Sequence, residues 1–137
     1  MKNIILIISL FTGMAAVSQS GWDIKMNGRL LLNIPPENET ALIKRIIRTE
    51  WNKNGSLEIK YHNTEKNPWK RSFSLTDEKD KELYLAENTS YVKLSLARLR
   101  KLFKGKKQLR IYAIIAPPNP DMGAPIRRIH LCTLRLP

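Results

Sequence analysis

The sequence predicts an all-β fold, a sandwich of antiparallel sheets with one short amphipathic helix. Three observations lead to this prediction. Most of the chain consists of short segments in which apolar and polar residues alternate, which is the pattern of half-buried strands. Turn residues separate these segments about every 8 to 12 residues, as in sandwiches and barrels. One segment, 95–104, breaks this rhythm with the period of a helix.

The first alternating segment, 23–32, contains Asn27-Gly28 at its centre. This dipeptide is typical of a type I′ hairpin turn, so the segment is either two short strands or one strand with a bulge. Many short strands with regular turns are typical of two-sheet sandwiches in the style of immunoglobulin domains. Further alternating segments lie at 57–62, 72–75, 83–85 and 109–115, and the chain closes on an extended segment at 126–136.

The helical segment is 95–104. Its apolar residues recur at intervals of three and four, and cations fill the other face, which predicts an amphipathic helix. Ser95 is a favourable N-cap, and Gly105 is a favourable residue just beyond the C-terminus. We therefore expect two to three turns of helix, with the residues Leu96, Leu99, Leu102 and Phe103 facing the core.

A weak internal similarity links 46–59 to 92–111. Each passage has an apolar pair, a hydroxyl residue, a short segment, a glycine and a second apolar alternation. Both passages therefore predict a strand, a hydroxyl cap, a helical crossover and another strand. The spacing of apolar residues over 40–51 also fits an amphipathic helix, so strand and helix both remain open there, and we favour a strand over 44–49.

Residues 1–18 have the pattern of a secretory signal peptide. Lys2 precedes the apolar run 4–16, and Ala16 and Ser18 are small residues at the positions that a signal peptidase reads. The run is too short to anchor the chain across a bilayer. We expect a signal peptide at 1–18, a single β-rich domain at 19–137 without a transmembrane anchor after cleavage, and a periplasmic or secreted location.

The chain is strongly basic, with 24 Lys and Arg residues against 12 Asp and Glu residues and a formal net charge of +12. Such an excess bears on partners and solubility and not on fold. Export disfavours nucleic acid as a partner. The partner classes that remain are an anionic envelope polymer, a lipid surface and an acidic protein.

The densest group of cations runs over the predicted helix and its exit. Several cations on one rigid element create a local potential that attracts anions, which predicts a non-catalytic binding or structural module. The alternative is an ordinary solvated helix face. The candidate anion-binding residues are Arg98, Arg100, Lys101, Lys104, Lys106 and Lys107.

A small metal-binding protein is the second hypothesis. His130, Cys132 and Met122 are soft or borderline ligands near the end of the chain, and His62 could join them. The order of these residues differs from that of blue-copper proteins, and no common zinc spacing is present. On a regular strand His130 and Cys132 would share a face about 7 Å apart, too far for a Cys-His catalytic pair.

A hydrolase with loop carboxylates is the third hypothesis. Asp77 and Glu78 lie in a lysine-rich predicted turn, and Asp121 lies in a proline-rich one. A general acid needs a rigid, buried position, which such turns do not predict. No nucleotide-binding motif is present. We therefore expect no enzyme activity and no cofactor.

Four stretches of the C-terminal half carry a resemblance to other proteins. They are PWKR at 68–71, DEKD at 77–80, KLFKGKK at 101–107 and RRIHLCTL at 127–134. In these stretches the chain resembles a group of small uncharacterised secreted proteins of Gram-negative bacteria. The resemblance implies a shared fold and export, and it implies no activity.

Overall fold

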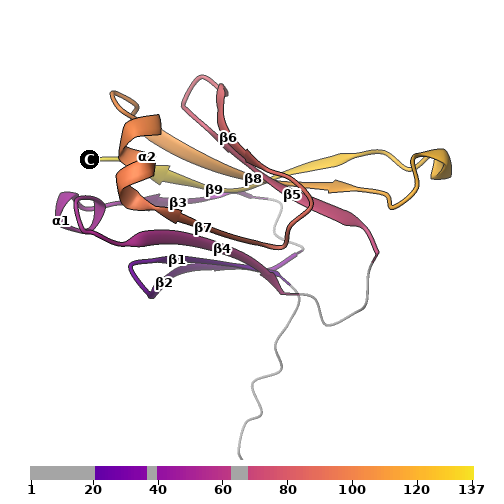
Figure 1. Cartoon of the computed structure of the whole chain (residues 1–137), viewed down its shortest axis with the longest axis horizontal. Helices are drawn as coiled ribbons and strands as arrows, with labels where there is room; N and C mark the ends of the chain where they lie inside the picture. Colours follow the sequence, from indigo (N-terminus) through magenta and orange to yellow (C-terminus); the bar gives the residue numbers. More distant parts are fainter. Residues whose placement is uncertain (1–20, 37–39, 63–67) are drawn as a thin grey trace, which may run out of the picture.

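Two β-sheets form the two layers of the structure, and two short helices lie at one end of them (Figure 1). The structure is a computed structural model that describes residues 21–36, 40–62 and 68–137. The segment 1–18, predicted to be a signal peptide, lies outside the described residues. The predicted all-β sandwich with a short helix is confirmed.

The first sheet, sheet A, is antiparallel throughout. Its strand order is β2-β1-β4-β7. The alternation of apolar and polar residues read from the sequence sends one side of each strand into the core. The strands are β1 (Gly21–Met26), β2 (Arg29–Ile34), β4 (Ser56–His62) and β7 (Tyr91–Ser95).

The second sheet, sheet B, has the strand order β3-β9-β8-β5-β6. It departs from the antiparallel prediction at one edge, where β3 runs parallel to β9. Parallel neighbours need a long connection, and most of the chain lies between these two strands. The strands are β3 (Leu42–Arg45), β5 (Lys70–Thr76), β6 (Glu82–Ala86), β8 (Gln108–Ala116) and β9 (Arg127–Arg135).

The core lies between the sheets and is filled by the inward-facing residues of both. Trp22 and Phe73 are the largest fully buried side chains. Burial of such apolar area is the main favourable term in folding. The other fully buried large side chains are Ile24, Met26, Ile34, Leu57, Ile59, Leu75, Leu96, Leu99, Leu109 and Ile111.

The Asn27-Gly28 dipeptide forms the predicted hairpin turn between β1 and β2. Both residues have positive φ, 54° for Asn27 and 79° for Gly28, as a type I′ turn requires. The pairing of β1 with β2 also shifts register between Ile24 and Lys25. The segment is thus two strands and contains a bulge as well.

The helix α2 (Leu96–Leu102) confirms the predicted amphipathic helix. The Ser95 side chain accepts a hydrogen bond from the Arg98 N–H at 3.2 Å, and Gly105 follows with φ of 76°. Leu96, Leu99 and Phe103 are buried, so the helix closes one end of the sandwich. None of the helices in the described part of the chain is long and apolar enough to cross a membrane.

The strand favoured over 44–49 is wrong in its second half. The strand β3 ends at Arg45, and the one-turn helix α1 (Arg48–Trp51) follows. The predicted hydroxyl cap is also wrong, because Ile47 is the N-cap and makes no side-chain capping bond. Trp51 is 9% exposed, and its burial favours the helical turn because it brings this side chain to the core.

Both helices belong to crossovers between the sheets, β3-α1-β4 and β7-α2-β8, and both lie at the same end (Figure 1). The Arg100 guanidinium on α2 donates to the Trp51 carbonyl at 2.7 Å and to the Lys53 carbonyl at 3.1 Å. The Leu96 N–H donates to the Gly55 carbonyl at 2.9 Å. These bonds satisfy carbonyls that α1 and its exit leave without a helical partner.

Gly55 lies directly against the hairpin turn. The Asn27 side-chain amide donates to the Glu50 carbonyl and carboxylate, both at 3.0 Å. A Cβ atom at Gly55 would lie 1.7 Å from Asn27 Oδ1. A side chain at this position would therefore displace Asn27 and break the link between the hairpin and α1.

We expect Gly55→Ala to destabilise the fold by about 2 kcal/mol, since two partly buried hydrogen bonds of Asn27 would be lost. Chemical denaturation of both proteins measures the change. In an Asn27→Gly background the same substitution should cost much less, because the clashing side chain is absent. An equal cost in both backgrounds would contradict the explanation.

Candidate functional site

Three of the six predicted anion-binding cations contact other groups of the same protein. Arg100 bonds the carbonyls at the end of α1. The Arg98 guanidinium lies 5.1 Å from the centre of the Tyr84 ring, and Lys106 Nζ lies 2.8 Å from a carboxylate oxygen of Asp77. Arg100 and Lys106 are partly buried, whereas Arg98, Lys101, Lys104 and Lys107 are exposed, and the side chains of the last three form no hydrogen bond or ion pair within the described residues.

Asp77 is the buried acid that pairs with Lys106. Its side chain is 1% exposed, and its Oδ1 accepts the backbone N–H groups of Lys79 and Lys81, both at 2.9 Å. The hydrogen bond from Lys106, followed by the bonds from these backbone groups, lowers the pKa of Asp77 to about 2. Asp77 thus fastens the β5–β6 turn to the loop between α2 and β8.

A second group of cations lies beside Lys107, and the sequence prediction did not include it. The parallel register of β3 and β9 places Arg45 opposite Arg135. Arg48 follows two residues after Ile46, whose N–H donates to the Arg135 carbonyl at 2.8 Å. The Leu136 N–H donates to the Lys107 carbonyl, also at 2.8 Å. Backbone pairing therefore gathers four cations from three separate segments.

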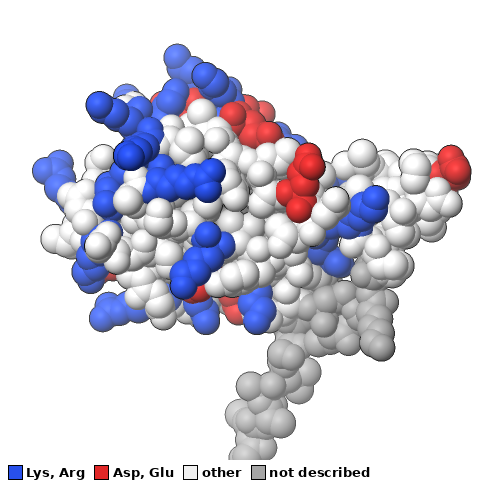
Figure 2. Space-filling view, in the orientation of Figure 1, with Lys and Arg blue, Asp and Glu red and all other residues white. Residues whose placement is uncertain are grey.

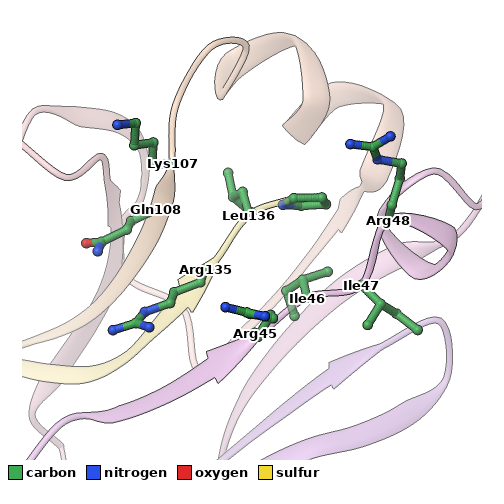
Figure 3. Close-up of a pocket in the computed structure, with 9 residues that line it drawn as sticks. Arg45, Ile46, Ile47, Arg48, Lys107, Gln108, Arg135 and Leu136 are labelled. Atoms are coloured by element: carbon green, nitrogen blue, oxygen red, sulfur yellow. The ribbon is translucent and has the colours of Figure 1, made fainter.

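These cations surround a hollow of about 560 Å³, which we call the basic hollow (Figure 3). Its apolar lining consists of Ile46, Ile47, Leu136 and Pro137, and its polar lining of Arg45, Arg48, Lys107, Gln108 and Arg135. Ile46 is 3% exposed, whereas Ile47 is 58% exposed. The basic hollow therefore has a floor fixed in the core and one large apolar side chain that faces solvent.

The four cations of the basic hollow form no ion pair with any acid of the described residues. In the part of the chain that the structure describes, the side chains of Arg45, Arg48, Lys107 and Arg135 form no ion pair or hydrogen bond, and no Asp or Glu lines the basic hollow. Like charges that face each other across paired strands are unfavourable. Bound anions would relieve this repulsion.

A smaller hollow of about 300 Å³ adjoins the basic hollow and shares Arg45, Ile46 and Ile47 with it. Glu50 lines this second hollow. Its carboxylate accepts hydrogen bonds from Lys53 at 2.6 Å and from Asn27 at 3.0 Å. These bonds lower the pKa of Glu50, with the Lys53 bond the largest cause. Glu50, the acid that lines this second hollow, is therefore already paired.

The outer face of sheet A shows the opposite arrangement. Acids and bases alternate around a hollow of about 550 Å³ there. Asp23 pairs with His62 and accepts a hydrogen bond from Asn33, and the Tyr91 hydroxyl donates to Glu58 at 2.6 Å. Burial opposes ionisation of Asp23, but its bonds to Asn33 and His62 outweigh burial and lower its pKa. The two acids that line this hollow, Asp23 and Glu58, are therefore both paired within the protein.

The expectation that His130 and Cys132 share a face is wrong. The register of β8 and β9 shifts at this point, so that Cys132 pairs with Ile111 and His130 with Tyr112. Ile111 and Tyr112 are consecutive on β8 and point to opposite faces. Because directly paired residues share a face, Cys132 points into the core and His130 points outward.

The outward His130 packs on Tyr112, with ring centres 4.5 Å apart. Its Nε2 lies 3.0 Å from Thr133 Oγ1 and 3.1 Å from the Cys132 carbonyl oxygen. Burial, together with the charges of Arg110 and Arg128, lowers the pKa of His130. The imidazole is thus held by its neighbours on the outer face of sheet B.

The remaining predicted metal ligands lie elsewhere. His62 ends β4 in sheet A, and Met122 lies in the short 3₁₀ helix η1 (Pro120–Met122) at the tip of the β8–β9 hairpin. Within 21–36, 40–62 and 68–137, no three His, Cys, Asp or Glu side chains group as metal ligands would. The structure does not bring the proposed His130, Cys132, Met122 and His62 set together.

The loop carboxylates of the hydrolase hypothesis are likewise separated. Asp77 is bound by Lys106, and a Glu78 carboxylate oxygen accepts the Lys107 N–H at 3.3 Å. Asp121 lies in η1, at the end of the molecule opposite the two helices (Figure 1). Asp77 and Glu78 make their bonds around the β5–β6 turn, and Asp121 is not close to them.

Sequence reasoning missed Arg45, Arg48 and Arg135. Arg45 and Arg48 enclose Ile46-Ile47, and cations on both sides of an apolar pair are a weak local signal. Arg135 is distant in sequence, and only the parallel pairing of β3 with β9 places it there. Comparison of the chain with protein-family models, with curated proteins and with solved structures finds no match.

The charge of Asp77 should contribute to stability in a pH-dependent way. Its folded pKa of about 2 lies below the ordinary value of 3.8, so its contribution is complete above that value and is lost as the pH falls toward 2. We expect Asp77→Asn to lower the melting temperature at pH 6. The difference in melting temperature between the variant and wild type should become smaller as the pH approaches 2. Thermal denaturation across this range measures it.

The exposed Asp121 provides the matched control for Asp77. Asp121→Asn should leave the melting temperature close to that of wild type at pH 6. If Asp77→Asn shows the same small effect, the ion pair with Lys106 does not hold the turn.

Cys132 should react with thiol reagents slowly in the folded protein and rapidly after unfolding. It is fully buried, so reagents cannot reach it in the folded protein. Burial also raises the pKa of its thiol, so little of the reactive thiolate form is present. An exposed cysteine from Lys101→Cys, in a Cys132→Ala background, should react rapidly without denaturant. Rapid labelling of native Cys132, or protection by added copper or zinc, would favour the metal hypothesis.

Proposed function

We propose that this chain is an exported, non-catalytic binding module that holds an anionic partner of the cell envelope at one end of its sandwich. One observation carries the proposal: four cations whose side chains form no ion pair within the described residues surround one hollow. Lys101 and Lys104 extend this cationic surface over α2. We call the whole surface the basic end: Arg45, Arg48, Lys101, Lys104, Lys107 and Arg135.

The chemistry of the basic end suits phosphate or carboxylate groups. Arginine binds both through paired N–H groups, and lysine adds a mobile point charge. Figure 2 shows Lys and Arg side chains gathered over α2 and the adjoining end of the sandwich. Several cations on one face produce a local potential that raises the concentration of anions beside it.

The predicted signal peptide and the resemblance to exported proteins support a periplasmic or secreted location, so we favour envelope anions over nucleic acid. The basic end also differs from the outer face of sheet A, where each described acid is paired with a neighbour. A net positive charge alone would not produce this difference between two surfaces. The proposal is therefore one of a localised site.

The basic end should bind anionic vesicles more weakly when its exposed lysines are neutralised. Exposed basic residues each contribute about 1 kcal/mol near an anionic surface. The triple variant Lys101→Gln, Lys104→Gln and Lys107→Gln should therefore bind about 100-fold more weakly. Co-sedimentation with vesicles containing an anionic lipid measures affinity, which should also fall as salt shortens the Debye length below about 10 Å.

The matched control changes the same total charge elsewhere. Lys25, Lys60 and Lys70 are exposed strand residues outside the basic end, and their replacement with Gln should weaken binding far less. Equal weakening by the two triple variants would show that net charge alone matters, and the proposed site would be rejected.

A further inference from the structure

We propose that the partner is an anionic phospholipid in a membrane surface, with Ile47 entering the lipid layer and the arginines of the basic hollow contacting phosphate groups. This inference rests on the proposed function and names the class of partner. It is carried by the combination of an exposed apolar side chain and unpaired cations in one hollow.

The arrangement begins with the local sequence. Arg45 and Arg48 lie on either side of Ile46-Ile47, at the point where β3 ends and α1 begins. Ile46 turns into the core at 3% exposure and anchors the segment, while Ile47 is 58% exposed. The same short crossover therefore presents an apolar side chain between two exposed cations.

The floor of the basic hollow continues this apolar surface. Leu136 and Pro137 line it together with the two isoleucines, and Figure 3 shows Leu136 between Lys107 and Arg48, with Ile46 beside Arg45. Exposed apolar area in contact with water is unfavourable. Contact with the acyl and glycerol region of a lipid would remove part of this area from water while phosphates meet the cations.

This combination separates a lipid from a soluble polyanion. A polysaccharide or polyphosphate offers charges and hydroxyls but no apolar surface for Ile47. Proteins that bind membrane surfaces combine apolar side chains with Lys and Arg, since insertion and attraction to anionic lipids add together. The described structure carries both kinds of group at the basic end, so the geometry favours the lipid.

The test removes the apolar contact and keeps every charge. Ile47→Ser is the main variant, and serine is a favourable N-cap, so α1 should remain intact. Ile126→Ser is the matched control, because Ile126 is 68% exposed and directly precedes β9 in the β8–β9 loop. This loop lies at the end of the molecule away from the two helices (Figure 1). Unchanged melting temperatures establish that both variants fold, and Ile47→Thr replaces Ile47→Ser if the latter does not.

We expect Ile47→Ser to bind vesicles of phosphatidylglycerol and phosphatidylcholine about tenfold more weakly, since partial burial of one isoleucine is worth about that factor. Ile126→Ser should bind like wild type. Soluble polyphosphate should bind both variants equally well, because Ile47 does not contact it. Vesicles of phosphatidylcholine alone should bind none of the proteins appreciably.

The outcomes distinguish the two proposals. If Ile47→Ser binds the mixed vesicles as tightly as wild type while the triple lysine variant binds weakly, the lipid inference is wrong and the anionic site stands. The inference is also wrong if Ile126→Ser loses as much affinity as Ile47→Ser. If the triple lysine variant matches its control variant, the proposed function itself fails.

Discussion

The structure depends on how the chain crosses between its two sheets at one end. Each crossover must leave one sheet, turn and enter the other without burying unpaired backbone groups. Arg100 satisfies two carbonyls at the end of α1, and Leu96 bonds the Gly55 carbonyl. Leu99 and Phe103 fill the space beneath. The two crossovers thus hold each other, and the core is closed by their contact.

The two crossovers also bring positive charge together at this end of the sandwich. Each crossover exposes a polar side, and in this chain that side is rich in Lys and Arg. Some of these cations are used internally, as Lys106 is by Asp77. Others, such as Arg45 and Arg135, meet through the parallel pairing of β3 with β9, and no acid of the described residues pairs with them. A cationic hollow with an apolar floor is the result.

Local irregularities decide the orientation of several side chains that the sequence pattern misplaces. Two-residue periodicity predicts that His130 and Cys132 share a face, but a register shift between β8 and β9 turns them to opposite faces. The shift cannot be read from β9 alone, because it is a property of two paired strands. The end of β3 at Arg45 is similar, since burial of Trp51 favours a helical turn over continued extension.

The sequence by itself determined most of the strands, the hairpin at Asn27-Gly28 and the helix capped by Ser95, because periodicity, turn chemistry and capping act between near neighbours. It also indicated Lys101, Lys104 and Lys107 as cations on one exposed segment. Only the tertiary structure decided which cations are paired internally and which surround a hollow. Arg45 and Arg135 lie far apart in the chain, and strand pairing alone brings their charges together.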